Sequence, residues 1–109
     1  LELALYPASL NRDSLLAAGT GAALSGCTAA VCYNDEVALQ VSRYLQDSGT
    51  AGQVELVSFD NSTIALLSSP PFFSLSNPKE QLGRLAAEKM LGILAGHPQQ
   101  PTVLPWSID

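Results

Sequence analysis

The stretch that decides the fold is residues 29–39, AAVCYNDEVAL. Its apolar part, Ala30–Cys32, carries no charge, which is typical of a strand that is covered on both faces of a sheet. Asn34 and Asp35 end this strand, and a short side-chain oxygen at either position can cap the first turn of a following helix. The stretch therefore predicts a buried strand, a polar turn and then a helix over 36–47.

A second strand ends in the same way. Residues 54–61, VELVSFDN, predict a strand followed by Asp60 and Asn61. The carboxyl ends of parallel strands meet at one edge of an open α/β sheet, and ligands bind there. Asn and Asp side chains at that edge suit a ligand rich in hydroxyl groups. The alternative is that each of these residues is only a helix cap or a turn residue.

The rest of the chain alternates between predicted strands and helices. Further strands are expected over 1–6, 72–76 and 102–108, further helices over 13–24 and 78–95, and a single helical turn over 61–67. This order predicts an α/β fold with a parallel sheet flanked by helices on both faces. Asn77 is the expected cap of the helix over 78–95, with Pro78 at its first position.

Two helices carry an apolar face that should pack on the sheet. In the helix over 36–47 this face consists of Val37, Ala38, Val41, Tyr44 and Leu45. In the helix over 78–95 it consists of Leu82, Leu85, Ala86, Met90, Ile93 and Leu94.

The composition limits the classes of function. The chain has 109 residues, so we expect one domain or one lobe of a larger domain. Its net charge is −5, with five Lys and Arg against ten Asp and Glu, and this balance argues against nucleic-acid binding by this segment. No apolar run is long enough to cross a membrane, and residues 1–6 do not look like a signal peptide. Because the chain does not begin with Met, we expect an excised piece of a longer protein.

The cysteine and histidine content argues against a metal centre or a cofactor. Cys27 and Cys32 are poorly placed for a mutual disulfide and fit no metal-binding spacing, and His97 is the only histidine. We expect two reduced thiols that behave as small apolar residues, which favours a cytoplasmic protein.

No catalytic residue is expected. The chain has no Ser–His–acid set, Ser58 lacks the glycines of a nucleophile elbow, and Gly19–Gly21 lacks the remainder of a phosphate-binding loop. Asp60 could also be the phosphate acceptor of a signalling receiver, but that class requires an acidic pair after the first strand, where this chain has Pro7. An α/β enzyme stays open as a weaker alternative to a binding protein.

Four motifs resemble the effector-binding domain of LacI/GalR-family transcriptional repressors, in that family's order and spacing. These are YNDEVAL at 33–39, LVSFDN at 56–61, FSLSNP at 73–78 and GRLAAE at 83–88. Cys32 before Tyr33 is similar to the arabinose-repressor branch, in which this domain is joined to a winged-helix DNA-binding domain. The resemblance implies one lobe of a periplasmic-binding-protein-like fold. Residues 1–109 would be the C-terminal subdomain, with the N-terminal lobe and the DNA-binding domain outside this chain.

The resemblance also implies the function and the site. A sugar or related metabolite would bind between the two lobes and control DNA binding by the absent domain. Asn34 and Asp60 would bind ligand hydroxyls, Asn77 would be a further polar contact, and Asp35 and Asn61 would hold their turns. Asn61 stands where the family has a second acid, which leaves the identity of the ligand open.

A homodimer is the expected assembly, because the family dimerises through this lobe. The interface residues would be Leu39, Arg43, Ile64, Leu66 and Leu67. The alternative function is a periplasmic sugar-binding protein that serves a membrane transporter, since that class has the same fold.

Overall fold

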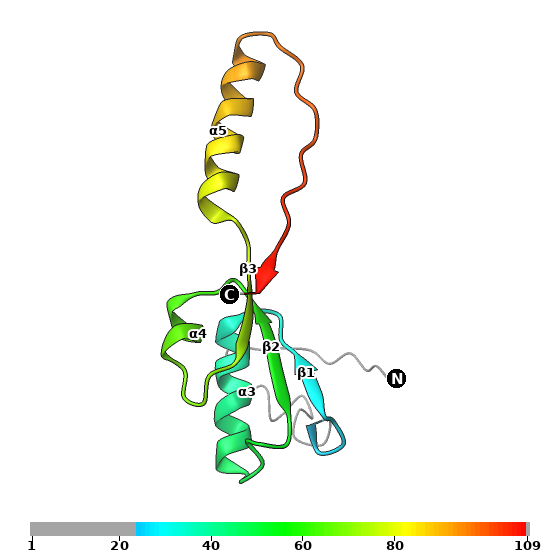
Figure 1. Cartoon of the computed structure of the whole chain (residues 1–109), viewed down its shortest axis with the longest axis vertical. Coiled ribbons are helices and arrows are strands. Elements are labelled where there is room, and N and C mark those ends of the chain that lie inside the picture. The colour runs from blue at the N-terminus through cyan, green and yellow to red at the C-terminus, as the bar shows by residue number, and fades with distance from the viewer. Residues whose placement is uncertain (1–23, 109) are drawn as a thin grey trace.

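The computed structural model describes residues 24–108, so the strand expected over 1–6 and nearly all of the helix expected over 13–24 lie outside the described residues. The described elements are β1 (Ala29–Val31), α3 (Asp35–Asp47), β2 (Glu55–Phe59), α4 (Thr63–Leu67), β3 (Phe73–Ser76), α5 (Lys79–Leu94) and β4 (Ser107–Ile108). They form a sheet flanked by helices (Figure 1), which confirms the α/β prediction.

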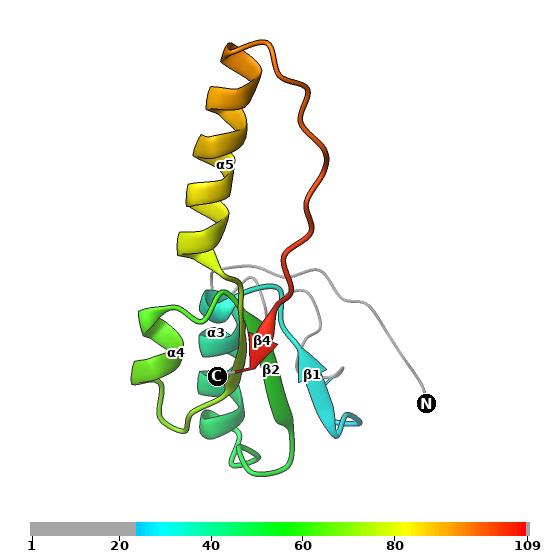
Figure 2. The same cartoon turned by 45° about the horizontal axis from the view of Figure 1, so that its top comes forward.

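The described strands form one sheet in the order β1-β2-β3-β4. β1, β2 and β3 are parallel, with Val31 beside Val57 and Val57 beside Phe73. β4 is antiparallel to β3, so the prediction of a wholly parallel sheet is wrong at this edge. The reason is that α5 projects beyond the sheet and the chain returns from its far end, entering the sheet in the opposite direction (Figure 2).

Local sequence signals determine the bounds of α3. The Asn34 side-chain oxygen accepts a hydrogen bond from the Val37 N–H at 3.0 Å, which satisfies a donor that the first turn cannot pair internally. Two acidic residues follow in that turn, where the helix dipole favours negative charge. Gly49, with φ of +72°, lies just beyond the last turn. The predicted helix is therefore confirmed to within one residue.

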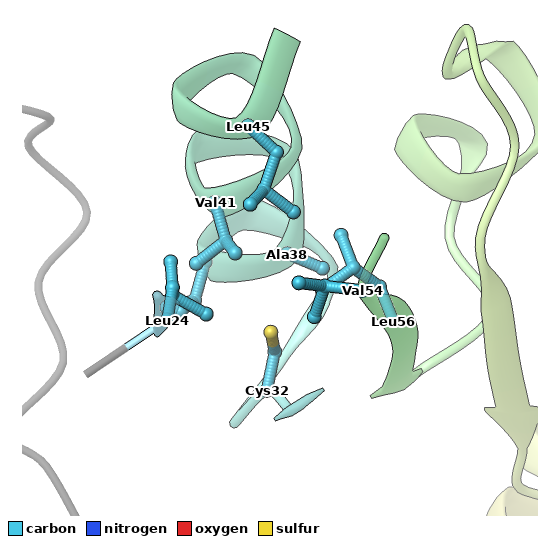
Figure 3. Close-up of a cluster of buried hydrophobic side chains, with 8 residues drawn as sticks. Leu24, Cys32, Ala38, Val41, Leu45, Val54 and Leu56 are labelled. Atoms are coloured by element: carbon cyan, nitrogen blue, oxygen red, sulfur yellow. The ribbon is translucent and has the colours of Figure 1, made fainter. Parts of the chain in front are cut away.

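The hydrophobic core lies between α3 and the sheet. Its buried members are Leu24, Cys32, Val37, Ala38, Val41, Leu45, Val54 and Leu56, most of which Figure 3 labels. The predicted buried face of α3 is confirmed, with Tyr44 packed at the margin of the core. Burial raises the pKa of the Cys32 thiol to about 11, so this side chain is a neutral part of the core near pH 7.

The predicted packing of α5 is wrong. None of its residues is buried, and Leu91 and Leu94 are 67% and 76% exposed. The helix extends away from the sheet (Figures 1 and 2) and so buries no apolar face against it. No helix between residues 24 and 108 has both the length and the hydropathy needed to cross a membrane.

β1 is likewise not covered on both faces, because Val31 is 71% exposed. Only one face of β1 and β2 packs against α3. The uncharged sequence of β1 was consistent with burial on both faces, but the described part of the chain supplies a covering helix on one side alone.

A buried carboxylate joins α3 to the sheet. Asp35 is 2% exposed and accepts four hydrogen bonds. The donors are the Ser58 hydroxyl at 2.5 Å and the Ser74 hydroxyl at 2.6 Å on Oδ1, and the Ser62 N–H and hydroxyl, both at 2.7 Å, on Oδ2. These donors belong to β2, β3 and the start of α4, so one side chain connects four elements.

The charge of Asp35 is stabilised by these donors. Burial alone raises the pKa of the carboxyl, but the hydrogen bonds from Ser58, Ser74 and Ser62 outweigh burial and leave the pKa below its ordinary value. A carboxyl with a lowered folded pKa stabilises the fold fully above its unfolded pKa. That stabilisation is lost as the pH falls through the folded pKa.

Replacing Asp35 by Asn should therefore destabilise the protein strongly near neutral pH. We expect a loss of about 2–4 kcal/mol in the free energy of unfolding, because the Asn amide puts N–H donors where donors already converge. The difference from the wild type should stay constant from about pH 7 to about pH 5 and shrink only as the pH falls below about 4, because only there does the wild type begin to lose its own carboxylate. Urea unfolding at a series of pH values measures both quantities.

Glu36→Gln is the matched control, since it removes the exposed carboxylate of the next residue. It should change the free energy of unfolding by no more than about 0.5 kcal/mol. A gap between Asp35→Asn and the wild type that stays constant down to about pH 2 would contradict the proposed source of stability.

Candidate functional site

Three polar residues follow three neighbouring strands. Asn34 comes after β1, Asp60 directly after β2 and Asn77 directly after β3. These strands are adjacent and parallel, so all three residues lie at the same edge of the sheet. We call this edge, with Asn34, Asp60 and Asn77, the polar rim.

Asn34 has a structural task that leaves part of its side chain available. Its Oδ1 atom caps α3 through the Val37 N–H. The amide nitrogen makes no hydrogen bond within residues 24–108 and retains two N–H donors. Capping and ligand binding are therefore compatible at this position, because they use different atoms.

The Asp60–Asn61 turn has an uncommon backbone conformation. The φ angles of Asp60 and Asn61 are +94° and +44°, values that L-residues other than glycine adopt at a cost of about 1 kcal/mol or more each. Asp and Asn tolerate this region better than most residues. The surrounding structure holds the turn, since the Asp60 N–H donates to the Leu75 carbonyl at 3.0 Å and the Lys79 ammonium donates to the Asp60 carbonyl.

Asn77 is not the cap of α5, so that prediction is wrong. α5 begins at Lys79 after Pro78, and no side chain caps it. The backbone carbonyl of Asn77, rather than its side chain, accepts from the Lys79 N–H at 2.9 Å. The Asn77 Oδ1 atom is buried and has no hydrogen-bond partner in the described part of the chain. An unmet buried acceptor costs about 1–3 kcal/mol, which is the kind of feature expected where a ligand group or water supplies the missing donor.

An open depression of about 700 Å³ lies beside the polar rim, where β3 leads into α5. Asn61 and Asn77 line it together with the charged residues Lys79, Glu80 and Arg84. Asn34 and Asp60 are not among its lining residues. The structure thus brings the three predicted residues to one edge but not into one enclosed pocket.

Sequence reasoning missed the residues that support the rim. Ser58 and Ser74 are buried and pair in register on β2 and β3. A buried serine at the same register position of two neighbouring strands is a weak signal that a buried acceptor lies nearby. Lys79 was also missed, because nothing in the sequence shows that its ammonium reaches the Asp60 carbonyl.

The residues expected at a dimer interface lie on α3 and α4, which contact each other. Leu66 and Leu67 are 75% and 78% exposed, and Arg43 is exposed as well. Leu39 and Ile64 are half-buried. Two large apolar side chains of α4 are therefore open to solvent in the single chain.

No set of three or more His, Cys, Asp and Glu side chains within residues 24–108 is arranged to hold a metal ion.

The sequence matches the family described as "Periplasmic binding protein-like domain" over residues 2–108. It is 35% identical over 66 residues to the HTH-type transcriptional repressor PurR of Vibrio parahaemolyticus, which covers 59% of this chain and 20% of that protein. It is 30% identical over 69 residues to the arabinose metabolism transcriptional repressor of Geobacillus stearothermophilus, which covers 62% of this chain and 19% of that protein.

A similar solved structure is the complex of the transcriptional regulator CelR with cellobiose. The two share 27% identity with a TM-score of 0.78, over 94% of this chain and 33% of that one. The matched region thus spans about a fifth of the two repressors' length and a third of the CelR chain. The resemblance to LacI/GalR-type regulators is confirmed, and the chain belongs to the periplasmic binding protein-like domain family.

Proposed function

We propose that this chain is the C-terminal lobe of the effector-binding domain of a cytoplasmic, sugar-responsive transcriptional regulator. A small sugar binds between this lobe and an N-terminal lobe outside the chain. Asn34, Asp60 and Asn77 supply hydrogen bonds to its hydroxyl groups. The protein acts without catalysis, metal or cofactor, and its DNA contacts belong to a further domain.

The observation that carries this proposal is the polar rim. Three neighbouring strands end in side chains that can together donate and accept hydrogen bonds, as a polyol requires. The buried Asn77 Oδ1 atom has no donor among residues 24–108, and a sugar hydroxyl is a suitable one. The relatives support the ligand class, because CelR was solved with cellobiose and the Geobacillus relative is named for arabinose metabolism.

The mechanism is a shift of population between arrangements of the two lobes. A sugar that contacts both lobes binds their closed arrangement more tightly than the open one, and so favours the closed state. The change in lobe arrangement then alters the affinity of the attached DNA-binding domain. α5 and the returning segment, residues 95–106 between α5 and β4, extend from the polar rim, so they are the described elements placed to transmit this movement.

A periplasmic sugar-binding protein is the second candidate, because it shares the fold and the ligand class. The relatives named as transcriptional repressors favour the regulator. Titrating the full-length protein with L-arabinose, cellobiose and other pentoses and hexoses by calorimetry tests the ligand class, and gel shift with its upstream DNA tests the regulator. Sugar binding without DNA binding would support the transport protein, and DNA binding without heat from any sugar would contradict a sugar effector.

Asp60→Asn should weaken sugar binding while leaving the fold intact. Asn tolerates the left-handed backbone of this position but lacks the charge, and a hydrogen bond to a charged group contributes about 1.5–3 kcal/mol. Affinity in calorimetry should fall by about 10- to 100-fold, with the free energy of unfolding changed by less than about 0.5 kcal/mol. Asp47→Asn is the control, because Asp47 is the last residue of α3 and lies at the end of the helix away from Asn34. This variant should bind sugar as the wild type does.

Leu66→Lys should weaken a homodimer of the full-length protein. A lysine at the centre of an apolar contact leaves a buried charge without a partner, so the dimer dissociation constant should rise by at least about tenfold. Sedimentation velocity over a concentration series measures this constant. Val103→Lys, which replaces an exposed apolar residue far along the returning segment, is the control. Equal effects of the two variants would place the interface elsewhere.

A further inference from the structure

The backbone that carries Asp60 is anchored at three consecutive N–H groups. The Asp60 N–H donates to the Leu75 carbonyl at 3.0 Å, the Asn61 N–H to the Ser74 hydroxyl oxygen at 2.8 Å, and the Ser62 N–H to the Asp35 carboxylate at 2.7 Å. Two of these three anchors lead to Asp35, one directly and one through Ser74.

The Ser74 hydroxyl is oriented by the carboxylate. A carboxylate only accepts hydrogen bonds, so the single hydroxyl proton of Ser74 must point to Asp35 Oδ1, 2.6 Å away. A lone pair of the same oxygen is then presented to the Asn61 N–H. The negative charge of Asp35 thereby strengthens a hydrogen bond to a residue that it does not touch.

The anchored turn is one that the chain would not adopt unaided. Both Asp60 and Asn61 have positive φ angles, and relaxing them to negative values would turn the Cα–Cβ bond of Asp60 in another direction. The direction of the Asp60 side chain therefore depends on the anchors that hold the turn.

We propose that Asp35 is a positioning residue of the effector site. Acting through Ser74 and Ser62, its buried carboxylate holds the Asp60–Asn61 turn in the left-handed conformation and so directs the Asp60 carboxylate toward a sugar hydroxyl. Asp35 itself does not contact the sugar, because all of its hydrogen bonds are internal. The sugar-directed part of this inference rests on the proposed function, whereas the hold on the turn does not.

A pair of matched variants separates this role from simple stabilisation. Ser74→Ala and Ser58→Ala each remove one hydroxyl from the same oxygen of Asp35, and both serines are buried and face each other in register. Only Ser74→Ala also removes the hydroxyl oxygen that accepts from the Asn61 N–H. Ser74→Thr and Ser74→Val form a second pair of nearly equal shape that differs in the hydroxyl, and it decides the question if Ser74→Ala does not fold.

Two measurements on the full-length protein give the result. Hydrogen exchange on peptides that cover residues 57–66 should be about tenfold faster in Ser74→Ala than in Ser58→Ala, because one amide has lost its acceptor. Affinity for L-arabinose and cellobiose should fall about tenfold in Ser74→Ala and stay within about twofold in Ser58→Ala. Ser74→Thr should resemble the wild type, and Ser74→Val should resemble Ser74→Ala.

Equal exchange and equal affinity in the two alanine variants would overturn the proposal, since Asp35 would then act only on stability. Faster exchange with unchanged affinity would overturn the positioning role in binding. If the wild type binds neither sugar, the proposed function fails for these probes, while the exchange comparison still decides whether Asp35 holds the turn.

Discussion

The structure depends on one buried carboxylate. Asp35 is the second residue of a polar turn, yet it is almost completely buried and its four hydrogen bonds come from three serines. An isolated carboxylate in an apolar interior is strongly unfavourable, so these donors are required for the fold to form around it. In return they fix the position of α3 against β2, β3 and α4, which the apolar contacts of the core alone would specify less sharply.

The same carboxylate connects the fold to the candidate site. The apolar core extends along α3 from Val37 to Leu45, and Asp35 lies at the start of the helix, where the strands end. Its donors include Ser62, which directly follows the Asp60–Asn61 turn, and Ser74, which accepts a hydrogen bond from the Asn61 N–H. The polar rim is thus built on a rigid support of internal hydrogen bonds, as precise binding of a small hydroxyl-rich molecule requires.

Features determined by local sequence could be predicted, and those determined by distant contacts could not. The bounds of α3 and its buried face followed from Asn34, Gly49 and the spacing of apolar residues, all within one segment. The placement of Asn34 and Asp60 at one edge followed from the parallel order of the strands, whereas Asn77 was expected as a polar contact only from the family resemblance. The prediction that α5 packs on the sheet was wrong, because an apolar face indicates that a helix has a partner but not which segment supplies that partner. The prediction that Asn77 caps α5 was wrong, because α5 begins only at Lys79, after the chain has turned away from the sheet at Pro78. The serine network was missed because a serine in a strand has no distinctive pattern until its acceptor is known.

The most direct measurement is a crystal structure of the full-length protein with L-arabinose or cellobiose bound. We expect the Asp60 carboxylate to contact a sugar hydroxyl, while Asp35 keeps its hydrogen bonds to Ser58, Ser62 and Ser74 and lies apart from the sugar. A structure in which the sugar contacts Asp35, or in which the Asp60–Asn61 turn has negative φ angles with sugar bound, would contradict the central role of the buried carboxylate.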